Sequence, residues 1–233
     1  MRGPGRRWGR TLACGGGAVL LSFSVQAQWG ASVAIDSDYR FRGVSLSDSK
    51  PGLRLTLNHE GPGAWYAGVS ATRAALTASD RYTQVLGYGG WLAPLDAGHS
   101  LELGASVAHF AGNSAYDYAE PYVGLLADRW QLRLYFSPNY FGRHVQTVYA
   151  EWNLQAPLNE RVRLFSHLGV LVTPRDNGDE ASRTRGDVRL GAGLVHRDSE
   201  LQLAWVAATR GGPYPAQYQG RRSTLVLSAA HSF

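Results

Sequence analysis

The sequence predicts an all-β fold, a transmembrane, antiparallel, up-and-down β-barrel of about 12 strands. Apolar and polar residues alternate with a period of two over repeated segments, which is typical of strands with two different faces. The connections alternate between short turns and longer polar loops. Five tryptophans lie close to predicted strand ends on the short-turn side. Together, these three patterns favour a barrel in an outer membrane.

The N-terminus has the three parts of a signal peptide, which we assign to residues 1–27. Four arginines and no acidic residue precede a short apolar stretch, and Val25-Gln26-Ala27 provides a cleavage site. The stretch is too short, and too rich in glycine, to span a bilayer as a helix. We therefore expect export, cleavage after Ala27, and a mature barrel over residues 28–233.

Period-two alternation begins immediately after this leader. The clearest example is Leu101, Leu103, Ala105 and Val107 with polar or small residues between them. The predicted strands are 29–41, 52–59, 64–72, 82–92, 100–110, 117–127, 130–137, 145–155, 161–172, 186–196, 200–209 and 222–233.

An even number of strands places both termini at one end of the barrel, the periplasmic end where the turns are short. The girdle of tryptophans predicted at this rim comprises Trp29, Trp65, Trp91, Trp130 and Trp152. The aromatic residues predicted to form a second girdle at the outer rim are Tyr39, Phe41, Phe110, Tyr140 and Phe141. Such rings favour the headgroup level of a membrane, so outer-membrane lipid is the expected surrounding.

A soluble β-sandwich is the alternative fold, because its strands also alternate. The length of the predicted strands and the two girdles favour the membrane barrel. The last strand must then pair with the first, so that no sheet edge faces lipid.

Three segments carry a family resemblance that extends over essentially the whole mature chain. Residues 37–48 read SDYRFRGVSLSD, residues 65–69 read WYAGV and residues 135–142 read YFSPNYFG. They resemble motifs of the TorF family of porins from proteobacteria, which implies an outer-membrane barrel in a Gram-negative envelope and brings no catalytic residues with it. Phe233 resembles the C-terminal signal read by the barrel-assembly machinery, which is therefore the expected partner during biogenesis.

The alternation of side chains between the two faces of each strand predicts which polar side chains point into the barrel. With the apolar face outward, Asn153, Asp187 and Gln202 point inward. The charged residues predicted to line the pore are Arg54, Glu102, Glu120, Arg133, Glu151, Arg163 and Arg189. Placing them outward instead would put charge in lipid, at a cost of about 2–4 kcal/mol for each arginine near the midplane. Either these residues line a passage or they form an internal network of ion pairs that fills it.

Composition excludes several other classes of function. The formal charge of +5 falls to +1 without the leader, which removes most of the support for nucleic-acid binding. One cysteine excludes a disulfide framework, and no pair of the seven histidines has a helical zinc-binding spacing. Residues 176–180 are rich in Asp and Glu but lack the frame of a calcium loop. We expect no metal, no cofactor and no catalytic site.

Three functions therefore compete. The favoured one is a passive porin for small polar solutes or ions, with weak charge selectivity. The second is a structural or adhesive barrel with a closed lumen, and the third is an outer-membrane enzyme. The sequence leaves the solute and the oligomeric state open.

Overall fold

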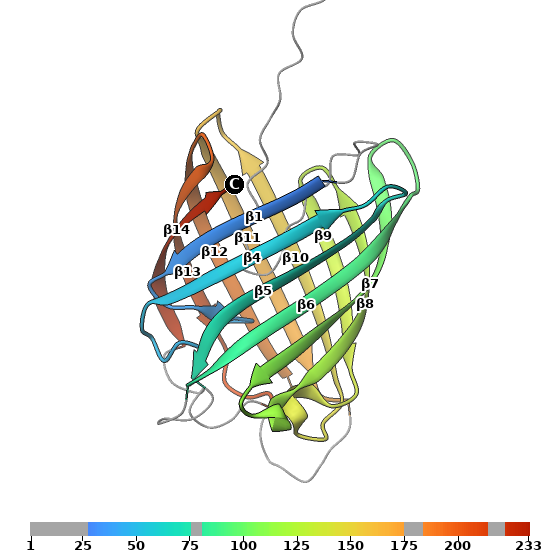
Figure 1. Ribbon diagram of the computed structural model, residues 1–233, viewed down its shortest axis with the longest axis vertical. Helices are drawn as coiled ribbons and strands as arrows, with labels where there is room; N and C mark the ends of the chain where they lie inside the picture. The colour runs from blue at the N-terminus through green and yellow to red at the C-terminus, as the bar shows by residue number, and fades with distance from the viewer. Residues whose placement is uncertain (1–27, 76–80, 175–183, 214–221) are drawn as a thin grey trace, which may run out of the picture.

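The computed structural model describes residues 28–75, 81–174, 184–213 and 222–233. The predicted signal peptide and residues 176–180 lie outside these ranges. Within them, twelve strands form one closed antiparallel barrel in which strands consecutive along the chain are neighbours (Figure 1). The first and last strands pair through residues 32–36 and 228–232, so the barrel has no open edge. The predicted fold class is confirmed, and the sandwich is excluded.

The strands of the barrel wall are β1 (Gln28–Asp36), β4 (Gly52–Glu60), β5 (Trp65–Ala75), β6 (Arg81–Pro94), β7 (His99–Ala111), β8 (Tyr118–Ala127), β9 (Trp130–Ser137), β10 (Thr147–Pro157), β11 (Val162–Val172), β12 (Thr184–His196), β13 (Ser199–Ala208) and β14 (Ser223–Ser232). Two short strands, β2 (Arg40–Phe41) and β3 (Val44–Ser45), form a separate ribbon. In the described parts of the longer connections lie two 3₁₀ helices, η1 (Ser114–Tyr116) and η2 (Tyr140–Gly142). Among the described residues, no helix has the length and apolarity needed to cross a membrane.

The two faces of the wall differ as the alternation predicts. Leucines and valines on nearly every strand point outward with 36–65% of their surface exposed, among them Leu55, Leu103 and Leu225. Glutamate, arginine, glutamine and tyrosine point inward and are buried. An exposed apolar band around a polar interior is the reverse of a soluble protein and suits a barrel surrounded by lipid.

The tryptophan girdle has the predicted outward orientation, with one displaced member. Trp29 and Trp65 are exposed near strand starts, and Trp65 pairs with the exposed Trp91. Trp130 starts β9 and is partly buried. Trp152 is the sixth of eleven residues in β10, because this strand begins and ends later than predicted. It therefore lies at mid-strand rather than at a rim.

The predicted second girdle is wrong. Phe110, Tyr140 and Phe141 have no exposed surface, and Tyr39 has only 7%. They belong to an apolar cluster in the barrel interior, with Phe41 packed against it. Tyr39, Tyr140 and Phe141 turn inward because the connections after β1 and β9 fold into the mouth of the barrel and need an apolar core there. Phe110 lies on the inner face of β7 and packs against Phe141.

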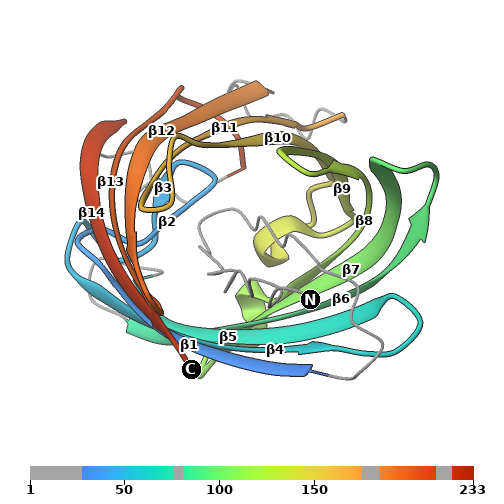
Figure 2. The same cartoon turned by 90° about the horizontal axis from the view of Figure 1, so that it is seen from above.

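The first predicted strand is too long for the same reason. β1 ends at Asp36 instead of residue 41, and the chain then forms the β2–β3 ribbon inside the ring of strands (Figure 2). Its two-residue turn, Arg42-Gly43, has positive φ angles of 49° and 72°, as a tight hairpin turn requires. We call residues 38–47 the inner hairpin.

Candidate functional site

The candidate site is the lumen of the barrel, where the structure places all seven charged residues predicted to line the pore. Arg54, Glu102, Glu120, Arg133 and Glu151 are at most 8% exposed and come from β4, β7, β8, β9 and β10. Arg163 on β11 and Arg189 on β12 are partly buried on the same inner face.

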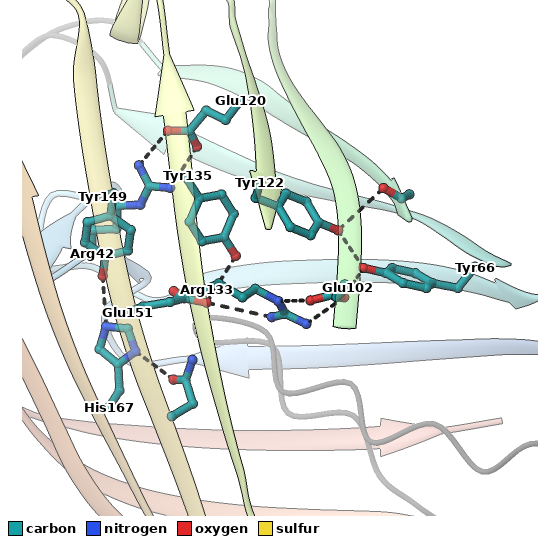
Figure 3. Close-up of polar contacts among 12 residues, drawn as sticks. Arg42, Tyr66, Glu102, Glu120, Tyr122, Arg133, Tyr135, Tyr149, Glu151 and His167 are labelled. Carbon is teal, nitrogen blue, oxygen red and sulfur yellow. Dashed lines mark hydrogen bonds and ion pairs between the residues drawn. The ribbon is translucent and has the colours of Figure 1, made fainter. Parts of the chain in front are cut away.

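The centre of the lumen is an ion-pair network that joins β9 to its neighbour β10 and, across β8, to β7 (Figure 3). The Arg133 guanidinium donates to both carboxylate oxygens of Glu102, at 2.5 and 3.1 Å. Its Nη1 lies 3.7 Å from Oε1 of Glu151, the residue directly opposite in the register of β9 and β10. Arg133 thus stands between two carboxylates, which compensates a charge that would be costly to bury alone.

Tyrosines complete the hydrogen bonds of this network. The Tyr66 hydroxyl donates to Glu102 and lies 2.6 Å from the Tyr122 hydroxyl, while Tyr135 donates to Glu151 at 3.1 Å. Our sequence reasoning missed these tyrosines. The signal was present, because Tyr122 and Tyr135 lie two residues after the inward-facing Glu120 and Arg133.

The inner hairpin crosses the lumen and is fastened to the far wall. Arg42 donates from Nη1 and Nη2 to the two oxygens of Glu120 on β8, at 2.9 and 2.8 Å. Its guanidinium also lies 4.0 Å from the centre of the Tyr149 ring. On the near side, a Cβ on Gly43 would lie 2.7 Å from the Cβ atoms of Ala208 and Asp187. The hairpin therefore bridges β12 and β13 on one side and β8 on the other.

Arg42 remains charged in this position. Burial by itself would lower its pKa, but the adjacent Glu120 and Tyr140 raise the pKa well above the usual arginine value. Within the hairpin, Arg40 pairs with Asp38 at 2.7 Å, and Ser45 donates to the same carboxylate at 2.5 Å. The motif that carries the family resemblance therefore forms a folded, internally bonded unit.

A second polar cluster surrounds His167 on β11. Its Nε2 lies 2.9 Å from Asp187 and 3.0 Å from the Tyr149 hydroxyl, and its Nδ1 lies 2.7 Å from Asn153. Both ring nitrogens have partners within the wall. Ser166 points away from this cluster, to the outer face, as strand parity predicts. This arrangement holds the wall together, and Ser166, on the outer face, cannot act as a nucleophile activated by His167.

Further ion pairs and hydrogen bonds lie elsewhere around the lumen. Arg163 donates to both oxygens of Glu200, at 2.5 and 2.6 Å. Arg54 lies 3.3 Å from Asp36. Arg189 donates to the neutral amide oxygen of Gln202 at 2.9 Å. Our sequence reasoning missed Glu200, although it lies two residues before the predicted inward Gln202.

Between these groups the lumen contains a cavity of about 170 Å³. Five carboxylates (Asp36, Asp38, Glu120, Glu151 and Asp187) and five arginines (Arg40, Arg42, Arg54, Arg133 and Arg189) line it, with tyrosines between them. A second cavity of about 20 Å³ shares Asp36, Arg54 and Arg189 with the first. In the described ranges, no three His, Cys, Asp or Glu side chains are grouped as metal ligands. The chemistry of the lumen is thus polar, aromatic and balanced in charge.

Comparison with solved structures shows the same fold in known barrels. The NanC porin aligns with a TM-score of 0.59 at 11% identity, and the KdgM porin with 0.56 at 10%. LpxR from Salmonella typhimurium aligns with 0.50 at 8%. Each match covers 88% of this chain and 99% of the other. At these identities the similarity establishes the fold alone. The descriptions of NanC and KdgM call them porins, whereas that of LpxR does not.

Sequence comparison assigns the chain to a protein family. No curated protein matches it significantly. A family model matches residues 24–224, which is most of the chain, and its description is "Bacterial protein of unknown function (Gcw_chp)". The chain therefore belongs to the Gcw_chp family of bacterial proteins.

Proposed function

We propose that this protein is an outer-membrane porin through which small polar solutes and ions pass passively, with weak charge selectivity. The observation that carries the proposal is the 170 Å³ cavity inside a closed barrel, lined by five residues of each charge. A lumen built only for stability would be filled, whereas this one keeps space along polar walls. Balanced charge in the lining opposes strong selection of either ion sign.

The likeness in fold to the NanC and KdgM porins supports transport, as does the resemblance of residues 37–48 to the TorF porins. One KdgM structure is described as a complex with disordered oligogalacturonate, and in our proposal this chain likewise admits polar solutes. In our proposal, the residues that line the path are Arg54, Glu102, Glu120, Arg133, Glu151, Arg163 and Arg189. They act by solvating the passing solute, without a catalytic step.

The proposal includes the route to the membrane. Residues 1–27 direct export and are removed, the barrel-assembly machinery reads Phe233, and the tryptophan girdle anchors the wall in outer-membrane lipid. Phe233 is 79% exposed at the rim, where an assembly factor can reach it. Intact mass of the protein from outer-membrane fractions should correspond to a chain that begins at Gln28.

A closed structural barrel is the second candidate, favoured by the inner hairpin. Arg42 and Glu120 join opposite parts of the lumen with side chains only 6% and 3% exposed, which narrows the mouth. In this case the outer loops would carry the function and the lumen would transport nothing.

Conductance of the protein extracted from outer membranes separates the two candidates. In planar bilayers with KCl on both sides, discrete current steps are expected for the porin. Heat-modifiable migration on gels checks that each preparation contains folded barrels. Absence of steps from folded barrels, in the wild type and in variants that release the inner hairpin, would refute transport.

A further inference from the structure

Three residues lie at the boundary between the two cavities of the lumen. Asp36, Arg54 and Arg189 line both the 170 Å³ cavity and the 20 Å³ cavity. A side chain that lines two neighbouring cavities stands between them. These three residues therefore form a partition across the path that a solute would follow.

Two arginines and one aspartate give the partition one excess positive charge. Asp36 is already engaged, since Ser228 donates to its Oδ1 at 2.6 Å and Arg54 lies 3.3 Å from its Oδ2. Arg189 donates to the neutral Gln202 and has no carboxylate in ion-pair contact within the described part of the chain. Its buried Nε also has no hydrogen-bond partner there.

This arrangement distinguishes Arg189 from other arginines of the lumen. Arg42, Arg133 and Arg163 each form a close ion pair with a glutamate, at 2.5–2.8 Å. Arg189 instead lies 5.1 Å from the centre of the Phe165 ring. Asp36 and Glu200 attract it and Arg54 and Arg163 repel it, none of them in direct contact. The fold thus leaves Arg189 without a direct ion pair at the position where the two cavities meet.

We propose that Arg189, together with Arg54, binds the carboxylate group of a small anionic solute at this partition and gives the channel a preference for anions. A guanidinium presents parallel N–H donors that match the two oxygens of a carboxylate. A carboxylate bound there would supply the direct ion-pair partner that Arg189 lacks. The inference rests on the proposed channel function and adds to it the sign of the selectivity and the class of solute.

The test uses gluconate, a small carboxylate, with sorbitol as its neutral counterpart. Wild type is compared with Arg189→Gln, with Arg189→Lys, and with the matched control Arg129→Gln in an exposed periplasmic turn. The chloride-to-potassium permeability ratio is measured in a KCl gradient. It should exceed one in wild type, fall about two- to threefold in Arg189→Gln, and be largely kept in Arg189→Lys and in the control. Gluconate, but not sorbitol, should block the chloride current, and Arg189→Gln should relieve the block.

A second measurement does not depend on conduction. Gluconate should raise the temperature at which the folded barrel loses its compact migration on gels, in wild type but not in Arg189→Gln. Conducting channels whose selectivity and gluconate response are unchanged in Arg189→Gln would overturn the site and leave the porin proposal intact. Folded barrels that never conduct, yet are stabilised by gluconate through Arg189, would overturn the porin proposal and keep the site.

Discussion

The ion pair between Arg42 and Glu120 should control whether the inner hairpin stays inside the barrel. Replacing Arg42 by Met keeps a side chain of similar length but removes two charge-assisted hydrogen bonds, at 2.9 and 2.8 Å, and the contact with the Tyr149 ring. It also leaves the carboxylate of Glu120 buried without its cation. Breaking a buried pair in this way costs about 3–5 kcal/mol.

We take the low end of this range, because Arg42 and Glu120 both line the cavity and water can solvate the orphaned carboxylate. A loss of about 3 kcal/mol increases the population of the undocked hairpin about 150-fold, at about 1.4 kcal/mol for each factor of ten. The strand pairing of the wall does not include the hairpin, so the barrel itself should remain closed.

Trypsin cleavage after Arg40 measures this population. The Arg40 side chain is 4% exposed while the hairpin is docked, so cleavage requires undocking. When docking is fast relative to cleavage, the rate follows the undocked fraction and should rise about 100-fold or more in Arg42→Met. Cleavage after the exposed Arg129 serves as the internal control and should not change.

Glu120→Gln should accelerate the same cleavage, and the double variant should show less than the sum of the two single effects, because the residues act as a pair. Single-channel current should rise in the same order if the hairpin narrows the path. Unchanged cleavage after Arg40 in both single variants, with folded barrels on gels, would show that the pair does not hold the hairpin.

Four further outcomes are expected. Gly43→Ala should also release the hairpin and increase trypsin cleavage there, because its Cβ would collide with the wall and its φ angle of 72° disfavours alanine. Leu134→Arg places a charge on the outer face and should destabilise the folded barrel by about 2–4 kcal/mol, which lowers the folded fraction on gels, whereas Leu134→Ile should not. Deleting Phe233 should lower the yield of assembled barrel in outer-membrane fractions, and wild-type yield would contradict its role as a signal. The pKa of Asp96 is lowered by hydrogen bonds from the backbone N–H of Gly98 and from the His99 side chain. The order of this turn should therefore persist above the usual aspartate pKa and be lost only as pH falls through the lowered value. NMR titration of the Asp96 carboxyl can follow this loss.

Strand parity explains why so much of the lumen could be predicted. Successive side chains of a strand point to opposite faces, so every residue is assigned to a face once the apolar face is known. Glu102 and Arg133 are each flanked by outward-facing leucines, which places both side chains inside the barrel. The same alternation also places Glu200, Tyr122 and Tyr135 on the inner face, although we did not name them among the predicted lumen residues. The wall was therefore predictable from local sequence.

The inner hairpin was not predictable in the same way. Arg42 and Glu120 are 78 residues apart, and nothing in the alternation of either segment links them. Tyr39 and Phe41 read as rim aromatics because a ring at a strand end suits lipid as well as it suits a core. Only the tertiary fold, in which the connection after β1 turns into the lumen, decides between these environments.

The ion-pair network fills the place of an apolar core, and it also limits how far the channel can widen. In the wall, Arg133 joins β7, β9 and β10, and Arg163 joins β11 to β13, so widening the path at these residues would remove ion pairs that stabilise the barrel. The inner hairpin is different, because β2 and β3 pair with each other rather than with the wall. It can leave the lumen without breaking the strand ladder that closes the barrel. If the protein opens, movement of the hairpin therefore costs less than rearrangement of the wall, and the residues that fasten it are the ones whose substitution should change conductance without unfolding the protein.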